Sequence, residues 1–114
     1  MELNELIESI KEFCQQRDWD QYHNPKDLAI GISTEAAELL DLFRFKNGDE
    51  IQQTITNKRE HIEDELADVL FFVLRFAQMN DIDLKKALEH KMAKNAAKYP
   101  VDKVKGNNKK YNEY

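Results

Sequence analysis

Apolar residues recur every three or four positions along four long stretches of this chain, which is the spacing of one face of an α-helix. In the first stretch these residues are Leu3, Leu6, Ile7, Ile10, Phe13 and Cys14. The 114 residues include only 3 glycines and 2 prolines, too few for the frequent turns of a β-sandwich or barrel. The sequence therefore predicts an all-α fold, a four-helix bundle with short connections.

Local signals mark where the helices begin and end. Asn24 and Pro25 are typical of a helix start, because Asn caps free N–H groups and Pro suits the first helical position. Asn47-Gly48 is typical of a helix end. We expect long helices over residues 2–17, 25–46 and 58–79 and from Asp81 or Asp83 to just before Pro100, with a short helix over 49–56. Residues 1–100 would form one helical domain, and residues 101–114 a lysine-rich, mobile tail.

Charge and composition argue against several classes of protein. The net charge of −5 disfavours nonspecific binding to nucleic acid. No apolar run approaches the ~20 residues that span a membrane, and no signal sequence precedes the first helical pattern. We therefore expect a cytoplasmic protein with neither nucleic acid nor membrane as a partner. The single cysteine, Cys14, falls on an apolar stripe and is expected to be a buried thiol.

Two acidic pairs, Glu35-x-x-Glu38 and Glu65-x-x-Asp68, lie within the second and third long helical patterns. The i, i+3 spacing places both members of a pair on one face of a helix. Glu35 falls inside an apolar stripe, where an isolated carboxylate is costly. If the helices pack side by side, four carboxylates converge, and a hard cation such as Mg²⁺ would relieve their repulsion. The pairs therefore predict a Mg²⁺ site, and sites of this kind usually meet substrate phosphates.

Two other interpretations of the acidic pairs remain open. In an acidic helical protein such pairs most often form a solvated helix face, and they also form buried ion-pair networks with Lys or Arg. Two pairs on adjacent amphipathic helices, both beside apolar stripes, are less common. The neighbouring Glu60, Glu63 and Asp64 fit a solvated face.

Aromatic residues near the acidic helices are candidates for binding a base. Trp19 and His23 lie in the connection before the second helix, Phe45 near the end of that helix, and Phe72 in the third. Nucleobases stack on aromatic rings, and His23 would contact the base or a metal. The alternative is that the rings belong to the core and that His23 is a surface residue.

A polar face on the last long helix is a candidate for binding phosphate. Lys91, Asn95 and Lys98 lie at i, i+4 and i+7, so they share one side of that helix. Their donor groups would hold phosphate oxygens, with Lys as a point charge. The alternative is a solvated lysine face. The sequence contains no pattern typical of a Ser/His/Asp or Cys/His nucleophile, a P-loop or a zinc site.

The third helix predicts a partner subunit. It is apolar almost all round from Val69 to Phe76, with Arg75 as the one charged exception. A helix of that kind must be covered on every side, and four short helices cover only part of it. A second copy of the chain would supply the missing cover.

Four stretches of the chain match one known family when they are taken together. They are RDWDQYHNPK at 17–26, EAAELLDLFRFK at 35–46, EDELADVL at 63–70 and KMAKNAAKYPV at 91–101. The chain resembles the all-α nucleotide pyrophosphohydrolases of the MazG-like group, and is most similar to their dCTP pyrophosphatase branch. The metal motif of that family is E-E-x-x-E followed by E-x-x-D. The matching residues here are Glu35, Glu38, Glu65 and Asp68, with Thr34 in place of the first glutamate, and Phe45 stands where the branch often has Trp.

This resemblance implies hydrolysis of a nucleoside triphosphate between its α and β phosphates, with Mg²⁺ as cofactor and Mn²⁺ as a substitute. Water would attack the α-phosphorus, and Glu35 or Glu38 would take its proton as the catalytic base. Lys91 and Lys98 would neutralise charge on the leaving pyrophosphate. The resemblance also implies a homo-oligomer, a dimer or tetramer, that completes the bundle and forms the site between subunits.

We therefore interpret the chain as a Mg²⁺-dependent nucleotide pyrophosphohydrolase for dCTP or a modified deoxynucleotide, with a role in nucleotide-pool housecleaning. One alternative keeps the same chemistry with dUTP or a broad set of triphosphates as substrate. The other is a helical interaction module with no enzymatic activity, in which the acidic pairs are solvated.

Overall fold

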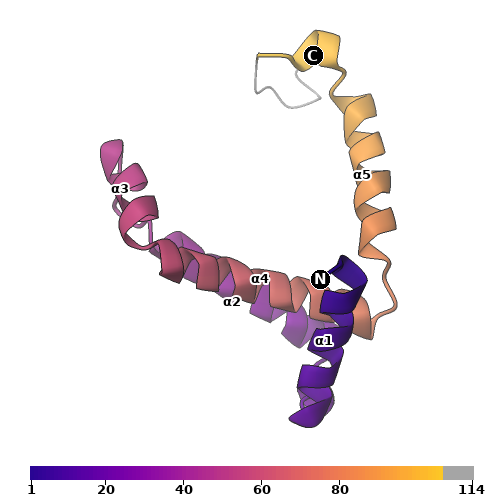
Figure 1. Cartoon of the computed structure of the whole chain (residues 1–114). Helices are drawn as coiled ribbons and strands as arrows, with labels where there is room; N and C mark the ends of the chain where they lie inside the picture. Colours follow the sequence, from indigo (N-terminus) through magenta and orange to yellow (C-terminus); the bar gives the residue numbers. More distant parts are fainter. Residues whose placement is uncertain (107–114) are drawn as a thin grey trace. The chain divides into compact units, whose positions relative to one another are not determined.

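The computed structural model describes residues 1–106, and these residues contain helices and connections but no strand (Figure 1). The helices are α1 (Leu3–Gln16), the short 3₁₀ helix η1 (Asp20–Tyr22), α2 (Pro25–Asp41), α3 (Asp49–Asn57), α4 (Arg59–Met79), α5 (Leu84–Lys98) and α6 (Val101–Val104). The predicted all-α class is confirmed. The predicted completion of the bundle by a second subunit stays a prediction.

The chain divides into two compact units, Met1–Asp81 and a second unit that begins at Ile82. The first unit contains α1 to α4, and the second contains α5 and α6. The predicted single helical domain over residues 1–100 stays a prediction. All four predicted metal ligands lie in the first unit.

The start of α2 follows its local signals, but its end does not. The Asn24 side chain accepts a hydrogen bond from the Asp27 N–H at 2.9 Å, and Pro25 occupies the first turn. The prediction of a helix to residue 46 was wrong, because α2 ends at Asp41. The N–H groups of four residues bond to carbonyls three residues back, namely Leu42, Phe43, Arg44 and Lys46. Phe45 adopts a left-handed φ of 64°. These tight turns end the α-helical ladder before Asn47-Gly48 is reached.

Helix α4 is the centre of the first unit, and α1, α2 and α3 all pack against it. The α2–α4 pair is the most extensive of these contacts, and the two helices run side by side (Figure 1). Gly31 permits their close approach, because a Cβ at this position would lie 2.7 Å from Cδ1 of Phe72. This packing fixes the relative positions of the acidic residues on the two helices.

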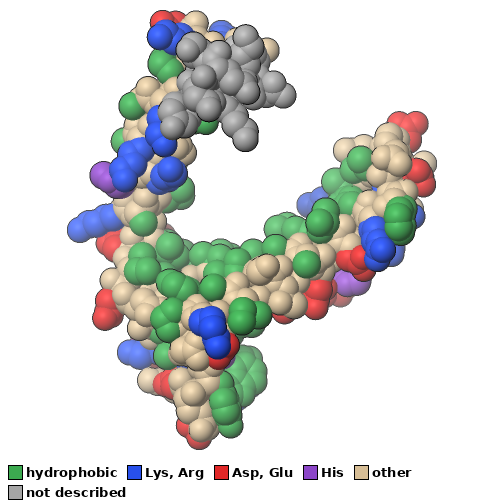
Figure 2. Space-filling view, turned by 180° about the vertical axis from the view of Figure 1, so that it is seen from behind, with side chains coloured by type: hydrophobic (Ala, Val, Ile, Leu, Met, Phe, Trp, Pro, Cys, Tyr) green, Lys and Arg blue, Asp and Glu red, His purple; other side chains and the backbone are tan. Residues whose placement is uncertain are grey.

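The fully buried apolar core of a single chain is small. Among the described residues it consists of Cys14, Leu28, Leu74 and Ala77, which confirms the prediction of a buried Cys14 thiol. Many large apolar side chains remain exposed, and Figure 2 shows hydrophobic side chains gathered along α2 and α4. Leu66 and Leu70 of α4 are 52% and 49% exposed. An apolar surface of this kind commonly marks an interface.

The second unit begins with α5, whose start is capped by Asp83. The Asp83 carboxylate accepts a hydrogen bond from the Lys86 N–H at 3.1 Å. The chain leaves α5 before Pro100, as predicted, and then forms the short helix α6, which was not predicted. Residues 107–114 of the predicted mobile tail lie outside the described residues. Within residues 1–106, no helix is both long and apolar enough to cross a membrane.

Candidate metal and nucleotide-binding site

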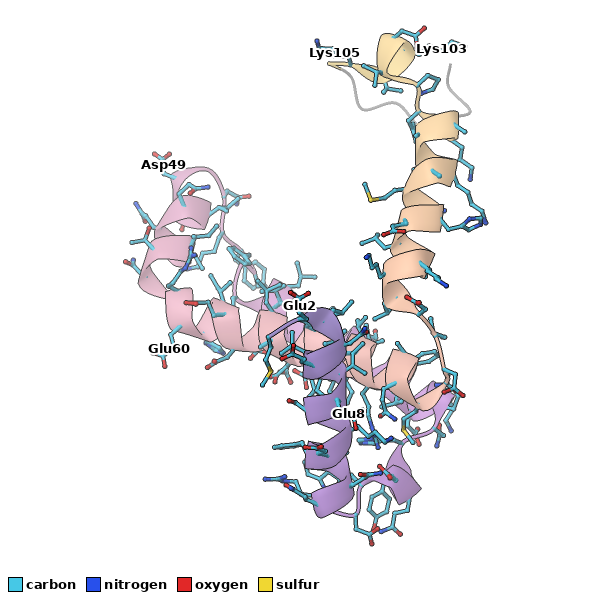
Figure 3. All side chains as sticks on the ribbon, turned by 45° about the vertical axis from the view of Figure 1, so that its right-hand side comes forward. Glu2, Glu8, Asp49, Glu60, Lys103 and Lys105 are labelled. Carbon is cyan, nitrogen blue, oxygen red and sulfur yellow. The ribbon has the colours of Figure 1, made fainter. Side chains whose placement is uncertain are left out.

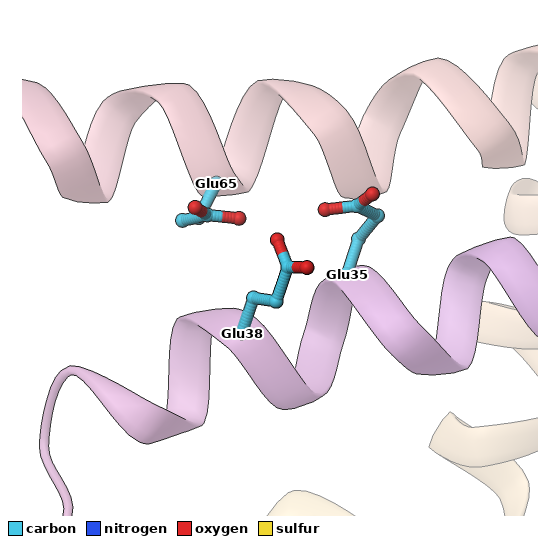
Figure 4. A group of neighbouring side chains, drawn as sticks. All are labelled: Glu35, Glu38 and Glu65. Carbon is cyan, nitrogen blue, oxygen red and sulfur yellow. The ribbon is translucent and has the colours of Figure 1, made fainter.

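Helices α2 and α4 bring three of the four predicted metal ligands together. Glu35 and Glu38 project from α2 and Glu65 projects from α4 into the space between the helices (Figure 4). One carboxylate oxygen from each residue lies within 4.8 Å of the other two. The i, i+3 spacing in α2 and the packing of α2 on α4 together produce this arrangement. We call these three residues the carboxylate cluster.

Burial and mutual repulsion disfavour ionisation of the carboxylate cluster. Burial, followed by the proximity of Glu38, Asp68 and Glu65, raises the pKa of Glu35 to about 7. Burial and the neighbouring Glu38 also raise the pKa of Glu65, although His61 partly opposes this effect. Both shifts have the same physical origin, because desolvation and nearby negative charge disfavour an ionised carboxyl.

Two oxygens of the carboxylate cluster are buried without a hydrogen-bond partner among the described residues. They are Oε2 of Glu35 and Oε2 of Glu65. The side chain of Glu65 is only 12% exposed. A buried carboxylate oxygen without a donor is costly, and a hard cation is the kind of partner that removes this cost. An all-oxygen donor set suits Mg²⁺ or Mn²⁺ better than a soft metal.

Asp68, the fourth predicted ligand, is exposed and lies outside the cluster of three. Its charge is nevertheless close enough to raise the pKa of Glu35. Asp68 lies one turn beyond Glu65 on α4, on the same side of that helix. Its role as a ligand stays a prediction.

An open pocket of about 510 Å³ adjoins the carboxylate cluster and is lined by Thr34, Ala37, Glu38, Asp41, Leu42, His61 and Glu65. His61 was not predicted as part of the site. Its Nε2 lies 3.2 Å from Oε1 of Glu65, one turn along α4. The i, i+4 spacing from Glu65 is the sequence signal that would have identified it. The pocket leaves one side of the carboxylate cluster open to solvent.

The neighbouring acidic residues behave differently. Glu60, Glu63 and Asp64 are exposed, as predicted. Figure 3 shows Glu60 pointing away from the helices, like Asp49 at the start of α3. Glu63 forms an exposed ion pair with Arg59, whose Nε lies 3.8 Å from Oε1 of Glu63. The solvated-face interpretation therefore describes these residues, but it does not describe the carboxylate cluster.

Trp19 and His23 lie close together at the start of α2. Their ring centroids are 6.2 Å apart, and Trp19 also meets Phe13 edge to face at 5.6 Å. Phe72 packs against Phe71 at 5.4 Å, and Phe71 in turn contacts Phe13. The three predicted base-binding residues of this region thus belong to one aromatic network, which also serves as packing between α1 and α4.

Phe45 lies apart from that network within one chain. It follows α2 at the end opposite His23, and a helix of 17 residues is about 25 Å long. Its ring is 83% exposed, with the Arg44 guanidinium 4.8 Å from the ring centroid. A nucleobase is much shorter than α2, so His23 and Phe45 of the same chain cannot line one base pocket.

Arg75 is the residue whose surroundings sequence reasoning missed. It was noted only as a charged exception in an apolar helix, but it is 1% exposed. Its guanidinium donates hydrogen bonds to Asp20, to Oε1 of Gln78 and, through Nε at 2.8 Å, to Nδ1 of His23. Asp20 and His23 are more than fifty positions away in the chain, and no local pattern indicated this contact.

Lys91, Asn95 and Lys98 lie on α5 in the second unit. All three are exposed. Their predicted role in binding phosphate therefore stays a prediction.

Known proteins of one family are similar to this chain over the region that contains the carboxylate cluster. The profile of the MazG-like family matches residues 30–114, a span that includes the carboxylate cluster. The chain belongs to the MazG-like family. Its relatives include dCTP pyrophosphatase 1 of Rattus norvegicus, 35% identical over 104 residues, and dCTP pyrophosphatase 1 of Homo sapiens, 34% identical over 104 residues. The resemblance to the MazG-like group inferred from the sequence is confirmed, and the relatives that match are dCTP pyrophosphatases.

The matches differ in how much of each protein they cover. The rat and human alignments cover 90% of this MazG-like chain but only 61% of those relatives. The crystal structure of a pyrophosphatase from Archaeoglobus fulgidus is similar to 85% of this chain, with a TM-score of 0.82 and 39% sequence identity, over 91% of its own chain. This chain therefore shares the fold of the Archaeoglobus fulgidus pyrophosphatase over most of the length of both proteins.

Proposed function

We propose that this protein is a Mg²⁺-dependent nucleoside triphosphate pyrophosphohydrolase. It would cleave dCTP or a modified deoxynucleoside triphosphate to the monophosphate and pyrophosphate, and so remove unwanted nucleotides from the cell's pool. The names of its relatives support the reaction class and the substrate. The observation that carries the proposal is the carboxylate cluster with its two unpartnered, buried oxygens.

The residues of the cluster fit a divalent cation. Glu35, Glu38 and Glu65 would hold it, and Asp68 would join them from the adjacent turn of α4. When bound, Mg²⁺ would supply Lewis-acid polarisation of phosphate oxygens and lower the pKa of water. Mn²⁺ prefers the same oxygen ligands and would substitute.

The protein's own groups would handle the proton and the leaving group. Glu35 or Glu38 would accept the proton of the water that attacks the α-phosphorus. Lys91, Asn95 and Lys98 would bind the leaving pyrophosphate, because their positive and donor groups offset its charge.

The base would bind between two subunits. Trp19, His23 and Phe72 would come from one chain and Phe45 from the other, because α2 separates His23 and Phe45 of one chain by about 25 Å. Two copies of α2 in opposite directions would bring His23 of one chain near Phe45 of the other. The exposed apolar side chains along α2 and α4 would be covered in such a homo-oligomer.

The test is hydrolysis of a panel of triphosphates by Glu38→Gln and Asp68→Asn, with Glu60→Gln as the matched control on a solvated face. We expect the first two variants to lose at least about a hundredfold in kcat, since several kcal/mol of charge stabilisation disappears. Glu60→Gln should retain full activity. The melting temperatures of Glu38→Gln and Asp68→Asn without metal should not fall, because removing one carboxylate relieves repulsion. Full activity of Asp68→Asn at ordinary Mg²⁺ concentration would contradict its assignment as a ligand.

The panel also separates the alternatives. Preference for dCTP would support the dCTP branch, whereas equal turnover of dUTP or ribonucleotides would favour a broad substrate range. A protein that hydrolyses none of them and whose melting temperature is unchanged by Mg²⁺ or Mn²⁺ would be an interaction module, since a ligand that binds the native state must stabilise it.

A further inference from the structure

The contact between Arg75 and His23 determines which nitrogen of the imidazole carries its proton. Arg75 Nε lies 2.8 Å from His23 Nδ1. An arginine guanidinium is always protonated and has no acceptor atom, so Arg75 must be the donor in this bond. His23 Nδ1 must therefore be the acceptor, without a hydrogen. A neutral imidazole with a bare Nδ1 carries its hydrogen on Nε2.

The surroundings of Arg75 hold this arrangement in place. Arg75 is 1% exposed, and its other nitrogens donate to Asp20 and to Gln78. The guanidinium is thus fixed by one partner from its own helix and one from η1. A buried charge with several hydrogen bonds cannot leave its partners without a large cost. The bond to His23 is therefore part of a rigid network.

Charge acts in the same direction as the hydrogen bond. Burial, and next the Arg75 guanidinium, lower the pKa of His23, while the Asp20 carboxylate opposes them. The charged groups that act on His23 are Arg75 from α4 and Asp20 from η1. An imidazolium would place a second positive charge against Arg75 and would lose the acceptor at Nδ1. His23 is therefore held in its neutral form.

We propose that Arg75 is a positioning residue that fixes His23 as a neutral imidazole with an Nε2–H donor for the substrate base. This inference rests on the proposed function, in which His23 contacts the base. A donor at this position selects an acceptor on the base, such as a carbonyl oxygen or a bare ring nitrogen. It disfavours an amino group or a ring N–H at the same place, because two donors would face each other.

The direct test is nuclear magnetic resonance of the whole protein with ¹⁵N-labelled histidine, without substrate. The signals of His23 are assigned by their loss in His23→Gln. We expect a protonated Nε2 and a bare Nδ1 that persist below the pH at which an ordinary histidine becomes charged. A hydrogen on Nδ1, or an even mixture of the two tautomers, would overturn the proposal in the unmodified protein.

Two variants show whether Arg75 is the cause. Arg75→Met should release the tautomer preference and return the pKa of His23 toward its ordinary value. Arg59→Met, an exposed arginine on the same helix, should change neither. If Arg75→Met does not fold, Asp20→Asn provides the second measurement. It leaves the Arg75 donor in place, so the tautomer should persist and the pKa of His23 should fall further. Loss of the Nε2–H tautomer in Asp20→Asn would refute the role given to Arg75.

Kinetics connect the tautomer to the substrate. Arg75→Met should raise KM about tenfold with little change in kcat, which is the effect of one hydrogen bond of ~1–1.5 kcal/mol. In a His23→Ala background the same substitution should have no further effect on KM, because the two residues act through one contact. Additive effects would contradict the proposal. An inactive unmodified protein with the expected tautomer would instead count against the proposed function alone.

Discussion

The affinity of the carboxylate cluster for Mg²⁺ should depend strongly on pH between 6 and 8. Metal ligands must be deprotonated, and the pKa of Glu35 without metal is about 7. At pH 6 only about one tenth of Glu35 is ionised, and at pH 8 about nine tenths. The Mg²⁺ dissociation constant should therefore be about tenfold larger at pH 6 than at pH 8. The raised pKa of Glu65 would steepen this dependence.

Rising pH strengthens Mg²⁺ binding, but it lowers the stability of the metal-free protein. A carboxyl whose folded-state pKa is raised binds its proton more tightly in the folded state. Its contribution to stability is therefore present at low pH and is lost as the pH rises from about 4.5 through about 7. Metal binding reverses this trend, because the cation favours the ionised form. Mg²⁺ should therefore raise the melting temperature more at pH 8 than at pH 6.

Isothermal titration calorimetry measures both the affinity and the protons released. At pH 7 the binding of Mg²⁺ should release about half a proton from Glu35, detected as a difference in heat between two buffers of different ionisation enthalpy. Glu35→Gln should bind more weakly and lose that proton release, and Glu60→Gln should behave like the unmodified protein. Equal dissociation constants at pH 6 and pH 8, with no proton release, would refute the reasoning.

Three further predictions concern packing, assembly and the binding of the base. Gly31→Ala should destabilise the protein by about 1–2 kcal/mol in urea unfolding, because overpacking against Phe72 costs ~1–3 kcal/mol and the better helix propensity of Ala returns up to ~1; an unchanged or higher stability would show that the Phe72 ring moves away freely. Light scattering at micromolar concentration should give a dimer or tetramer, and Phe45→Ala should raise KM about ten- to a hundredfold. A fully active monomer of 13.5 kDa would contradict a site shared between subunits.

Features that depend on nearby residues were predictable from the sequence. Asn24-Pro25 and Asp83 mark helix starts because a cap is formed within three residues. The convergence of Glu35, Glu38 and Glu65 follows from helical spacing once α2 and α4 are assumed to be neighbours. That assumption was correct because both helices carry an apolar face that must be buried.

Features that depend on distant residues were not predictable from the sequence. The apolar and helix-forming residues 42–46 continue the pattern of α2, yet the chain turns there and Phe45 adopts a left-handed conformation. Arg75 interrupts an apolar helix, and nothing in that pattern indicated that Asp20 forms an ion pair with it and that His23 accepts a hydrogen bond from it. The distance between His23 and Phe45 also became clear only from the length of α2.

The most direct test of the central claim is ³¹P nuclear magnetic resonance of the products formed from dCTP with Mg²⁺. Cleavage between the α and β phosphates must yield dCMP and pyrophosphate in equal amounts. No reaction should occur with a chelator present or with Glu38→Gln. Formation of dCDP and orthophosphate as the main products, or cleavage that persists without a divalent cation, would contradict the assignment of a metal-dependent pyrophosphohydrolase.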